Sequence, residues 1–139
     1  LLTTMERTIG FLNELKPTKI YADIFDFDLV NPDIKLIEEI IKNNSHVDGI
    51  FTFSDTLAIA TLNILQKIGK KVPEDVALIG YDDTPYSKWS TPSISTIHQS
   101  VNFMGKQSFI SLTRLIRGVE LESLHEIIDV KLIERQSTK

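Results

Sequence analysis

Two pairs of polar residues are of the types that bind a ligand with many hydroxyl groups. Ser54-Asp55 follows the apolar run 49–53, and Asp82-Asp83 follows the apolar run 76–81. A carboxylate accepts hydrogen bonds from ligand hydroxyls, and a hydroxyl side chain both donates and accepts them. If both runs are parallel strands of one sheet, their carboxyl ends meet at one crevice, where ligands bind in open α/β sheets. We therefore expect both pairs to face the same site.

Each pair also has an interpretation that needs no ligand. Ser54 or Asp55 could cap the helix that follows, a role worth ~1 kcal/mol, and for Asp55 we favour it. Asp82 and Asp83 could form a solvated turn before Pro85, since Asp is a common turn residue. Residue chemistry alone leaves these two interpretations of Asp82 and Asp83 about equally supported.

Composition argues against most other kinds of site. The chain has no cysteine, and its three histidines, His46, His98 and His125, are far apart in sequence, so we expect no metal and no cofactor. A magnesium-dependent phosphotransfer site at Asp82 and Asp83 would need a further carboxylate and a lysine, and none is evident. No phosphate loop or Ser-His-Asp arrangement occurs either, so we expect no enzyme activity.

Charge and hydropathy restrict the partners. The formal net charge is -4 and the basic residues are scattered, so this segment by itself should not bind nucleic acid. No apolar run approaches the ~20 residues that span a bilayer, and no signal peptide is visible, which suits a cytoplasmic protein. The chain starts with Leu1 and enters a helical pattern almost at once, which favours a natural N-terminus further upstream.

The elements that would position these side chains alternate between helices and strands. Apolar spacing predicts one helix through Met5, Ile9, Leu12 and Leu15, and another that opens at Asn31-Pro32. Further helices are expected after Ser54 and over 101–117. Strands are expected at 19–24, 49–53, 76–81, 93–98 and 126–133. Apolar strands that alternate with helices indicate an α/β fold, with a parallel sheet flanked by helices on both faces.

Four ordered motifs resemble the LacI/GalR family of transcription regulators. They are the strand and Ser-Asp-helix run at 48–60, the stretch Val72-Pro73-Glu74-Asp75 through Gly80-Tyr81-Asp82-Asp83, the run 92–99 followed by Gly105, and the ending Leu132-Ile133-Glu134-Arg135-Gln136-Ser137-Thr138. Arg7, Gly10 and Phe11 also fit the family's Arg-x-x-Gly-Phe. The resemblance covers nearly the whole chain.

The resemblance implies one lobe of a periplasmic-binding-protein-like type I fold, the C-terminal part of an effector-binding domain spanning 1–139. The second lobe would hold about 1–92 and 126–139. Residues 93–125 would form a hinge strand and a helix that packs on a first lobe outside this chain, and the DNA-binding headpiece would also lie outside it. The implied effector-binding residues are Arg7, Ser54, Asp82 and Gln99.

Arg7 and Gln99 each keep an alternative role, and Ser54 departs from the family pattern. Arg7 could grip vicinal hydroxyls or a phosphate with its planar fork, or be a solvated helix residue. Gln99 could contact the effector or satisfy backbone groups at the hinge, and we favour the hinge. Ser54 stands where the family more often has Asn, so it lacks an amide donor.

The function implied is a sugar-responsive repressor that binds a small sugar or sugar phosphate and reaches operator DNA through its headpiece. The alternative is a solute-binding protein of a sugar transport system with the same fold. A homodimer is expected through Ile59, Tyr86 and Trp89, since the resemblance places Ile59 and Trp89 where the second lobes of the family meet. The helix after Ser54 supports this expectation, because it is apolar beyond its core stripe, with Leu57, Ile59, Ala60 and Ile64 also on it. Trp89 could instead stack on a sugar ring or fill the local core.

Overall fold

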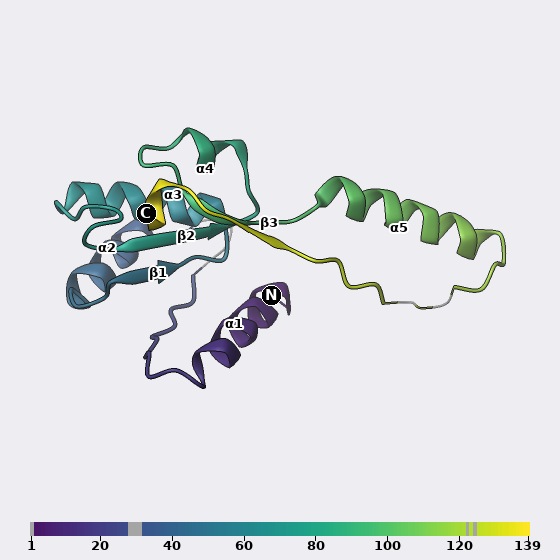
Figure 1. The fold of residues 1–139 in the computed structure, drawn as a ribbon, viewed down its shortest axis with the longest axis horizontal. Helices are drawn as coiled ribbons and strands as arrows, with labels where there is room; N and C mark the ends of the chain where they lie inside the picture. Colours follow the sequence, from purple (N-terminus) through teal and green to yellow (C-terminus); the bar gives the residue numbers. More distant parts are fainter. Residues whose placement is uncertain (1, 28–31, 122, 124) are drawn as a thin grey trace.

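A computed structural model describes residues 2–27, 32–121, 123 and 125–139 and shows an α/β fold. The elements are α1 (Leu2–Leu15), α2 (Ile34–Asn43), β1 (Gly49–Phe51), α3 (Asp55–Lys67), β2 (Ala77–Tyr81), α4 (Pro85–Trp89), β3 (Ser95–His98), α5 (Val101–Ile116), β4 (Lys131–Ile133) and the 3-10 turn η1 (Gln136–Thr138). The sheet order is β1-β2-β3-β4, and the first three strands are parallel whereas β4 is antiparallel to β3 (Figure 1).

Helices cover both faces of the sheet, as the sequence predicts. Successive residues of a strand point to opposite faces. On β2, Leu78 and Gly80 are buried, and Gly80 meets Asp55 and Ala58 of α3. Tyr81 points to the other face, where α1 supplies Arg7, and on that face Phe11 of α1 also stacks on Phe51 of β1 with ring centroids 5.3 Å apart. On β2, the residues that face α3 are buried, whereas those that face α1 are only partly buried.

Helix α2 begins later than predicted, and its position explains the unusually apolar surface of α3. The expected start at Asn31-Pro32 is wrong: the helix begins at Ile34, because Asp33 caps it by accepting from the amides of Lys35 and Leu36. Asn31 itself lies outside the described residues. Ile37 of α2 packs with Leu57 and Ile64 of α3 in a buried cluster. Two residues of the supposed second apolar face of α3 are therefore covered within the chain.

The strand predicted at 19–24 is not formed. The segment has no regular secondary structure, and Tyr21 is 98% exposed. A strand is stable only where a neighbour completes its hydrogen-bond ladder and covers one face of it. Within the described residues, β1 pairs only with β2. Residues 19–24 therefore have the composition of a strand but no neighbouring strand to pair with.

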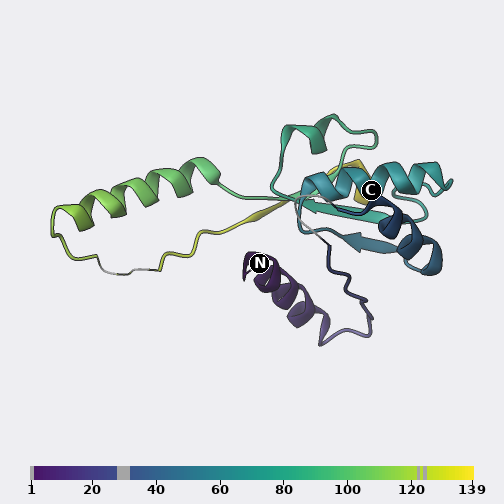
Figure 2. The same cartoon turned by 180° about the vertical axis from the view of Figure 1, so that it is seen from behind.

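The C-terminal third leaves the body of the molecule and returns to it. β3 leads out to α5, which projects away from the sheet and has no buried residue, and the chain comes back through β4 (Figures 1 and 2). Both crossing strands are shorter than predicted, covering Ser95–His98 and Lys131–Ile133. The helix itself matches the prediction within one residue, and Gly118 at φ +71 follows its end.

Candidate functional site

A hollow of about 340 Å³ opens beyond the carboxyl end of β2, between α1 and the segment that follows β3. Glu6, Arg7, Tyr81 and Gln99 line it. Arg7 and Glu6 come from α1, Tyr81 ends β2, and Gln99 follows β3. This is the position at which the sequence places a ligand site, and the volume lies within the usual range for small-molecule pockets, roughly 300 to 1,000 Å³.

The guanidinium of Arg7 is held in place from three directions. Its Nη1 donates to the carbonyl oxygen of Phe53 at 2.7 Å, and its Nη2 lies 3.8 Å from Oδ1 of Asp82. The group also lies over the ring of Tyr81, 3.7 Å from the centroid. A guanidinium has five N–H donors, so several remain for a ligand. Because the group is already oriented, a ligand would lose less entropy on binding it.

Asp82 lies beside this arginine and takes part in the same cluster. Its Oδ1 accepts from Nε2 of Gln99 at 2.8 Å. Burial raises the pKa of the Asp82 carboxyl above its ordinary value, and the charge of Arg7 opposes that rise. The structure thus brings Arg7, Asp82 and Gln99 together, as the sequence predicts. Gln99 faces Asp82 with its side chain, which argues against the purely backbone role that we favoured.

The sequence allowed Ser54 or Asp55 to cap α3, and the structure gives this role to Ser54 and not to Asp55, for which we favoured it. Ser54 is the N-cap of α3, since its Oγ accepts from the amide of Leu57 at 3.2 Å. Asp55 is not a cap. It is fully buried, and accepts from the amide and hydroxyl of Thr84 at 2.6 and 3.0 Å and from the hydroxyl of Thr96 at 2.6 Å. Asp55 therefore ties α3 to the turn after β2, and Ser54 does not line the hollow.

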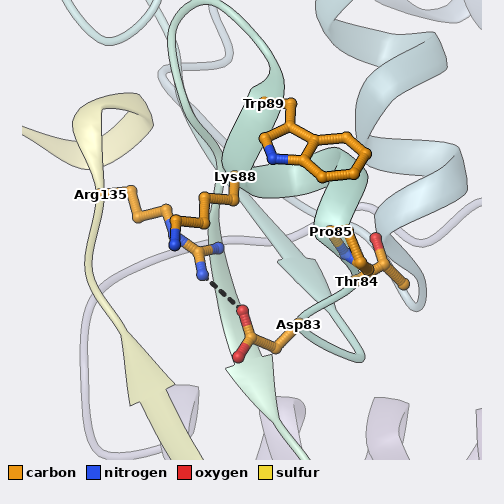
Figure 3. Close-up of a pocket in the computed structure, with 6 residues that line it drawn as sticks. All are labelled: Asp83, Thr84, Pro85, Lys88, Trp89 and Arg135. Carbon is orange, nitrogen blue, oxygen red and sulfur yellow. Dashed lines mark hydrogen bonds and ion pairs between the residues drawn. The ribbon is translucent and has the colours of Figure 1, made fainter.

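Asp83 faces a different set of side chains from Asp82. Its Oδ1 accepts from Nη2 of Arg135 at 2.5 Å (Figure 3), and its Oδ2 lies 2.8 Å from Nδ1 of His98. Burial acts to raise the pKa of Asp83, but hydrogen bonds from Arg135 and His98 outweigh it and lower the pKa. Asp82 and Asp83 have φ values of +106° and +53°. This turn sends neighbouring carboxylates to separate sites, so the expectation that both pairs share one crevice is wrong.

Two lining residues, Glu6 and Tyr81, were missed by the sequence reasoning. Tyr81 was assigned only to the strand at 76–81, and Glu6 was given no role. Glu6 directly precedes Arg7, and Tyr81 directly precedes Asp82, so each lies next to a predicted site residue. Strand alternation could have identified Tyr81, because it lies on the face opposite to Gly80.

The residues predicted for a dimer interface lie apart from this site. Tyr86 and Trp89 of α4 are 66% and 71% exposed, and their rings meet edge to face with centroids 5.9 Å apart. Ile59 is half-buried and packs against the main core cluster. Within the part of the chain that the structure describes, no group of three or more acidic or histidine side chains could hold a metal ion. No described helix is long and apolar enough to cross a membrane.

Comparison with known proteins identifies the family of the chain. The model of the periplasmic binding protein-like domain matches residues 3–138. The chain belongs to the periplasmic binding protein-like domain family. Among relatives of this family, the HTH-type transcriptional repressor PurR of Vibrio atlanticus is 28% identical over 97% of this chain and 42% of its own length.

Solved structures of periplasmic binding protein-like regulators match the fold. The complex of the transcriptional regulator CelR with cellobiose has a TM-score of 0.88 and 27% identity, over 96% of this chain and 42% of that chain. A periplasmic binding protein/LacI transcriptional regulator from Alkaliphilus metalliredigens, complexed with D-xylulofuranose, has a TM-score of 0.84 and 29% identity, over 96% and 51%. The chain thus spans about half, or less, of the proteins it matches.

Proposed function

We propose that this chain is the C-terminal part of the effector-binding domain of a sugar-responsive LacI-type repressor. The observation that carries the proposal is the cluster of Arg7, Asp82 and Gln99 at the mouth of the hollow beyond β2. Charge-assisted donors and acceptors held in one orientation are suited to the hydroxyls of a small carbohydrate. The similar solved complexes with cellobiose and D-xylulofuranose support the same ligand class.

The charges of the hollow favour a neutral sugar over a sugar phosphate. Glu6 in the lining and Asp82 beside Arg7 bring two carboxylates, and Arg7 brings a single guanidinium. A phosphate placed here would meet an excess of like charge, whereas ligand hydroxyls can donate to the carboxylates and accept from Arg7. Ser54 contributes by capping α3, and Phe53, the residue before Ser54, holds Arg7 through its carbonyl.

The rest of the mechanism belongs to the intact cytoplasmic protein. Residues 1–92 and 126–139 would form its second lobe, and the strand and helix within 93–125 would join a first lobe, so the hollow is one wall of a cleft between them. A ligand that binds one relative orientation of the lobes better would shift the population toward it. A headpiece outside this chain would carry that change to operator DNA. Regulators among the relatives favour this function over the solute-binding alternative.

Replacement of Asp82 tests the proposal. In the intact protein, Asp82→Ala should weaken binding of the cognate sugar by about 1.5 to 3 kcal/mol, the usual contribution of a hydrogen bond to a charged group. Titration calorimetry with neutral pentoses, hexoses and disaccharides would identify the ligand and measure the loss. Asp48→Ala is the matched control. Asp48 is exposed and lies just before the amino end of β1, whereas the hollow lies beyond the carboxyl end of β2. An unchanged dissociation constant for Asp82→Ala would make Asp82 a turn residue.

A further inference from the structure

The turn that carries Asp82 is strained, because two successive residues with side chains have positive φ. The φ values of Asp82 and Asp83 are +106° and +53°. Residues other than glycine rarely adopt this conformation, and it persists only where the surrounding structure fixes it. From this turn, the side chain of Asp82 lies beside Arg7 and accepts from Gln99. The site at Arg7 therefore depends on the contacts that hold the turn.

Three successive backbone amides of the turn each donate a hydrogen bond. The amide of Asp82 donates to a backbone carbonyl of β3 at 2.9 Å. The amide of Asp83 donates to Oγ1 of Thr96, also on β3, at 3.3 Å. The amide of Thr84 donates to Oδ2 of Asp55 at 2.6 Å. Strand β3 and Asp55 together hold the turn.

Asp55 acts on two of these three bonds. Its other oxygen, Oδ1, accepts from the hydroxyl of Thr96 at 2.6 Å, so Asp55 also orients the group that binds the second amide. Its Oδ2 accepts from the hydroxyl of Thr84 at 3.0 Å as well as from the amide. Asp55 and Thr96 are both fully buried, and a Cβ at Gly80 would clash with Oδ1. The carboxylate is thus packed against β2, two residues before Asp82.

We infer that Asp55 is a positioning residue of the site at Arg7, in addition to its part in the fold. By holding the two threonines, it fixes the turn in the conformation that directs Asp82 to Arg7 and Gln99. Asp55 does not line the hollow, so it acts through Asp82. That this site binds an effector rests on the proposed function, whereas the positioning of Asp82 does not.

The side-chain amide of Gln99 reports the position of Asp82, because its Nε2 donates to Oδ1 of Asp82. Two-dimensional amide NMR spectra of the chain would follow this signal, and Asp82→Ala gives its position when the bond is absent. In Asp55→Ala the turn loses an acceptor and relaxes, so the Gln99 signal should move most of the way to that position. In the double variant Asp55→Ala/Asp82→Ala it should stay where Asp82→Ala alone puts it, because Asp55 acts through Asp82.

Thr96→Val tests the same link without emptying space in the core, and it decides the matter where Asp55→Ala does not fold. Valine has nearly the shape of threonine, but the hydroxyl between Asp55 and the amide of Asp83 is lost. The Gln99 signal should again move toward that of Asp82→Ala.

Asp55→Asn should restore the wild-type position of the Gln99 signal. The amide oxygen of asparagine can accept from Thr84, and its Nδ2 can donate to Oγ1 of Thr96, so the turn keeps its contacts. A shift as large as that of Asp55→Ala would show that the charge of Asp55, and not its hydrogen bonds, acts on Asp82, and would overturn the proposal.

Ser137→Ala is the control for lost stability. Ser137 is as fully buried as Asp55, and its hydroxyl bonds to Leu78 and Ser95, near the amino ends of β2 and β3. It should lower the melting temperature, because two buried hydrogen bonds are lost, and leave the Gln99 signal in place. An equal shift in this control, or a wild-type signal in folded Thr96→Val, would contradict the proposal. No sugar enters these measurements, so the proposal can fail while the proposed function stands.

Discussion

At the residue scale, Asp82 and Asp83 have environments that shift their pKa values in opposite directions. Burial raises the pKa of Asp82, whereas Arg135 and His98 lower that of Asp83 against the effect of its own burial. A folded-state pKa above the unfolded value means that ionisation of Asp82 costs stability. Such a loss of stability is typical of a binding residue, because a bound ligand can offset the unfavourable burial of its charge. Asp83, in contrast, stabilises the fold when it is ionised.

We expect Asp83→Asn to lower the free energy of unfolding by about 1 to 3 kcal/mol near neutral pH, because the amide loses the ion pair with Arg135. Asn tolerates the positive φ at this position, so the backbone should adapt. The contribution of Asp83 is fully present above its unfolded pKa of about 3.9 and is lost as the pH falls through its lower folded value. Thermal melts over this acid range should show a smaller pH dependence for the variant.

Asp82→Asn is the matched control for this prediction. It keeps an oxygen that can accept from Gln99 and removes a charge whose burial is unfavourable. Its melting temperature should equal or exceed that of the wild type near neutral pH. A drop as large as that of Asp83→Asn would contradict the difference in environment.

At the element scale, α3 and β2 can approach closely because Gly80 of β2 has no side chain. A Cβ at Gly80 would lie 2.4 Å from Oδ1 of Asp55, which is itself fixed by Thr84 and Thr96. We expect Gly80→Ala to lower the free energy of unfolding by about 1 to 3 kcal/mol, through overpacking and damage to the Asp55 hydrogen bonds. Denaturant unfolding would measure it.

Gly10→Ala is the control for Gly80→Ala, since Gly10 lies within helix α1 and a Cβ there meets no atom within 4 Å. Alanine should stabilise that helix by about 0.5 to 1 kcal/mol. If the two substitutions had the same effect, contact between α3 and β2 at Gly80 would not be the cause.

Helix α5 is expected to be the least protected helix of the chain when it is a monomer. Seven of its large apolar side chains are exposed: Val101, Phe103, Met104, Phe109, Leu112, Leu115 and Ile116. Most helices depend on tertiary packing for stability, whereas no residue of α5 is buried. Amide exchange in a monomeric sample should be much faster in α5 than in α3. Slow exchange there in a clean monomer would contradict the idea that α5 needs a partner surface, whether another lobe or a second copy.

At the scale of the whole molecule, we expect the chain to form a homodimer through Ile59, Tyr86 and Trp89. The apolar surface of α3 supports this expectation less than the sequence suggested, because α2 covers Leu57 and Ile64. The exposed pair Tyr86 and Trp89 remains, and large aromatic residues are enriched at the centres of interfaces. A two-fold interface places one patch on both chains, so an inserted charge acts twice.

Ile59→Glu should therefore give a folded monomer by light scattering, with its helical circular dichroism retained. Because Ile59 also packs against the core, this variant could unfold, and Trp89→Glu supplies the second measurement at a site that is mostly exposed. Lys106→Glu, on the exposed surface of α5, is the charge control. If Trp89→Glu stays dimeric, the interface lies elsewhere on the chain.

The sequence by itself determined the features that depend on local pattern and on family motifs. Apolar periodicity located α1, α2, α3 and α5 and the strands β1, β2 and β3, because the side-chain periods of helices and strands differ. It did not predict the short helix α4. The strand-end rule placed Asp82 at the edge of the sheet where a ligand site is expected, and the family resemblance added Arg7 and Gln99. Both the fold class and the family followed from these residues.

Only the tertiary structure decided the features that depend on neighbours distant in sequence. Residues 19–24 have the composition of a strand and form none, because a strand requires a ladder partner. Asp55 is buried because Thr84 and Thr96 arrive from other elements to satisfy it. Asp82 and Asp83 are chemically identical in the sequence, and a turn with positive φ at both residues sends one to Arg7 and the other to Arg135. Burial and pairing are properties of the folded environment, which no single position in the sequence carries.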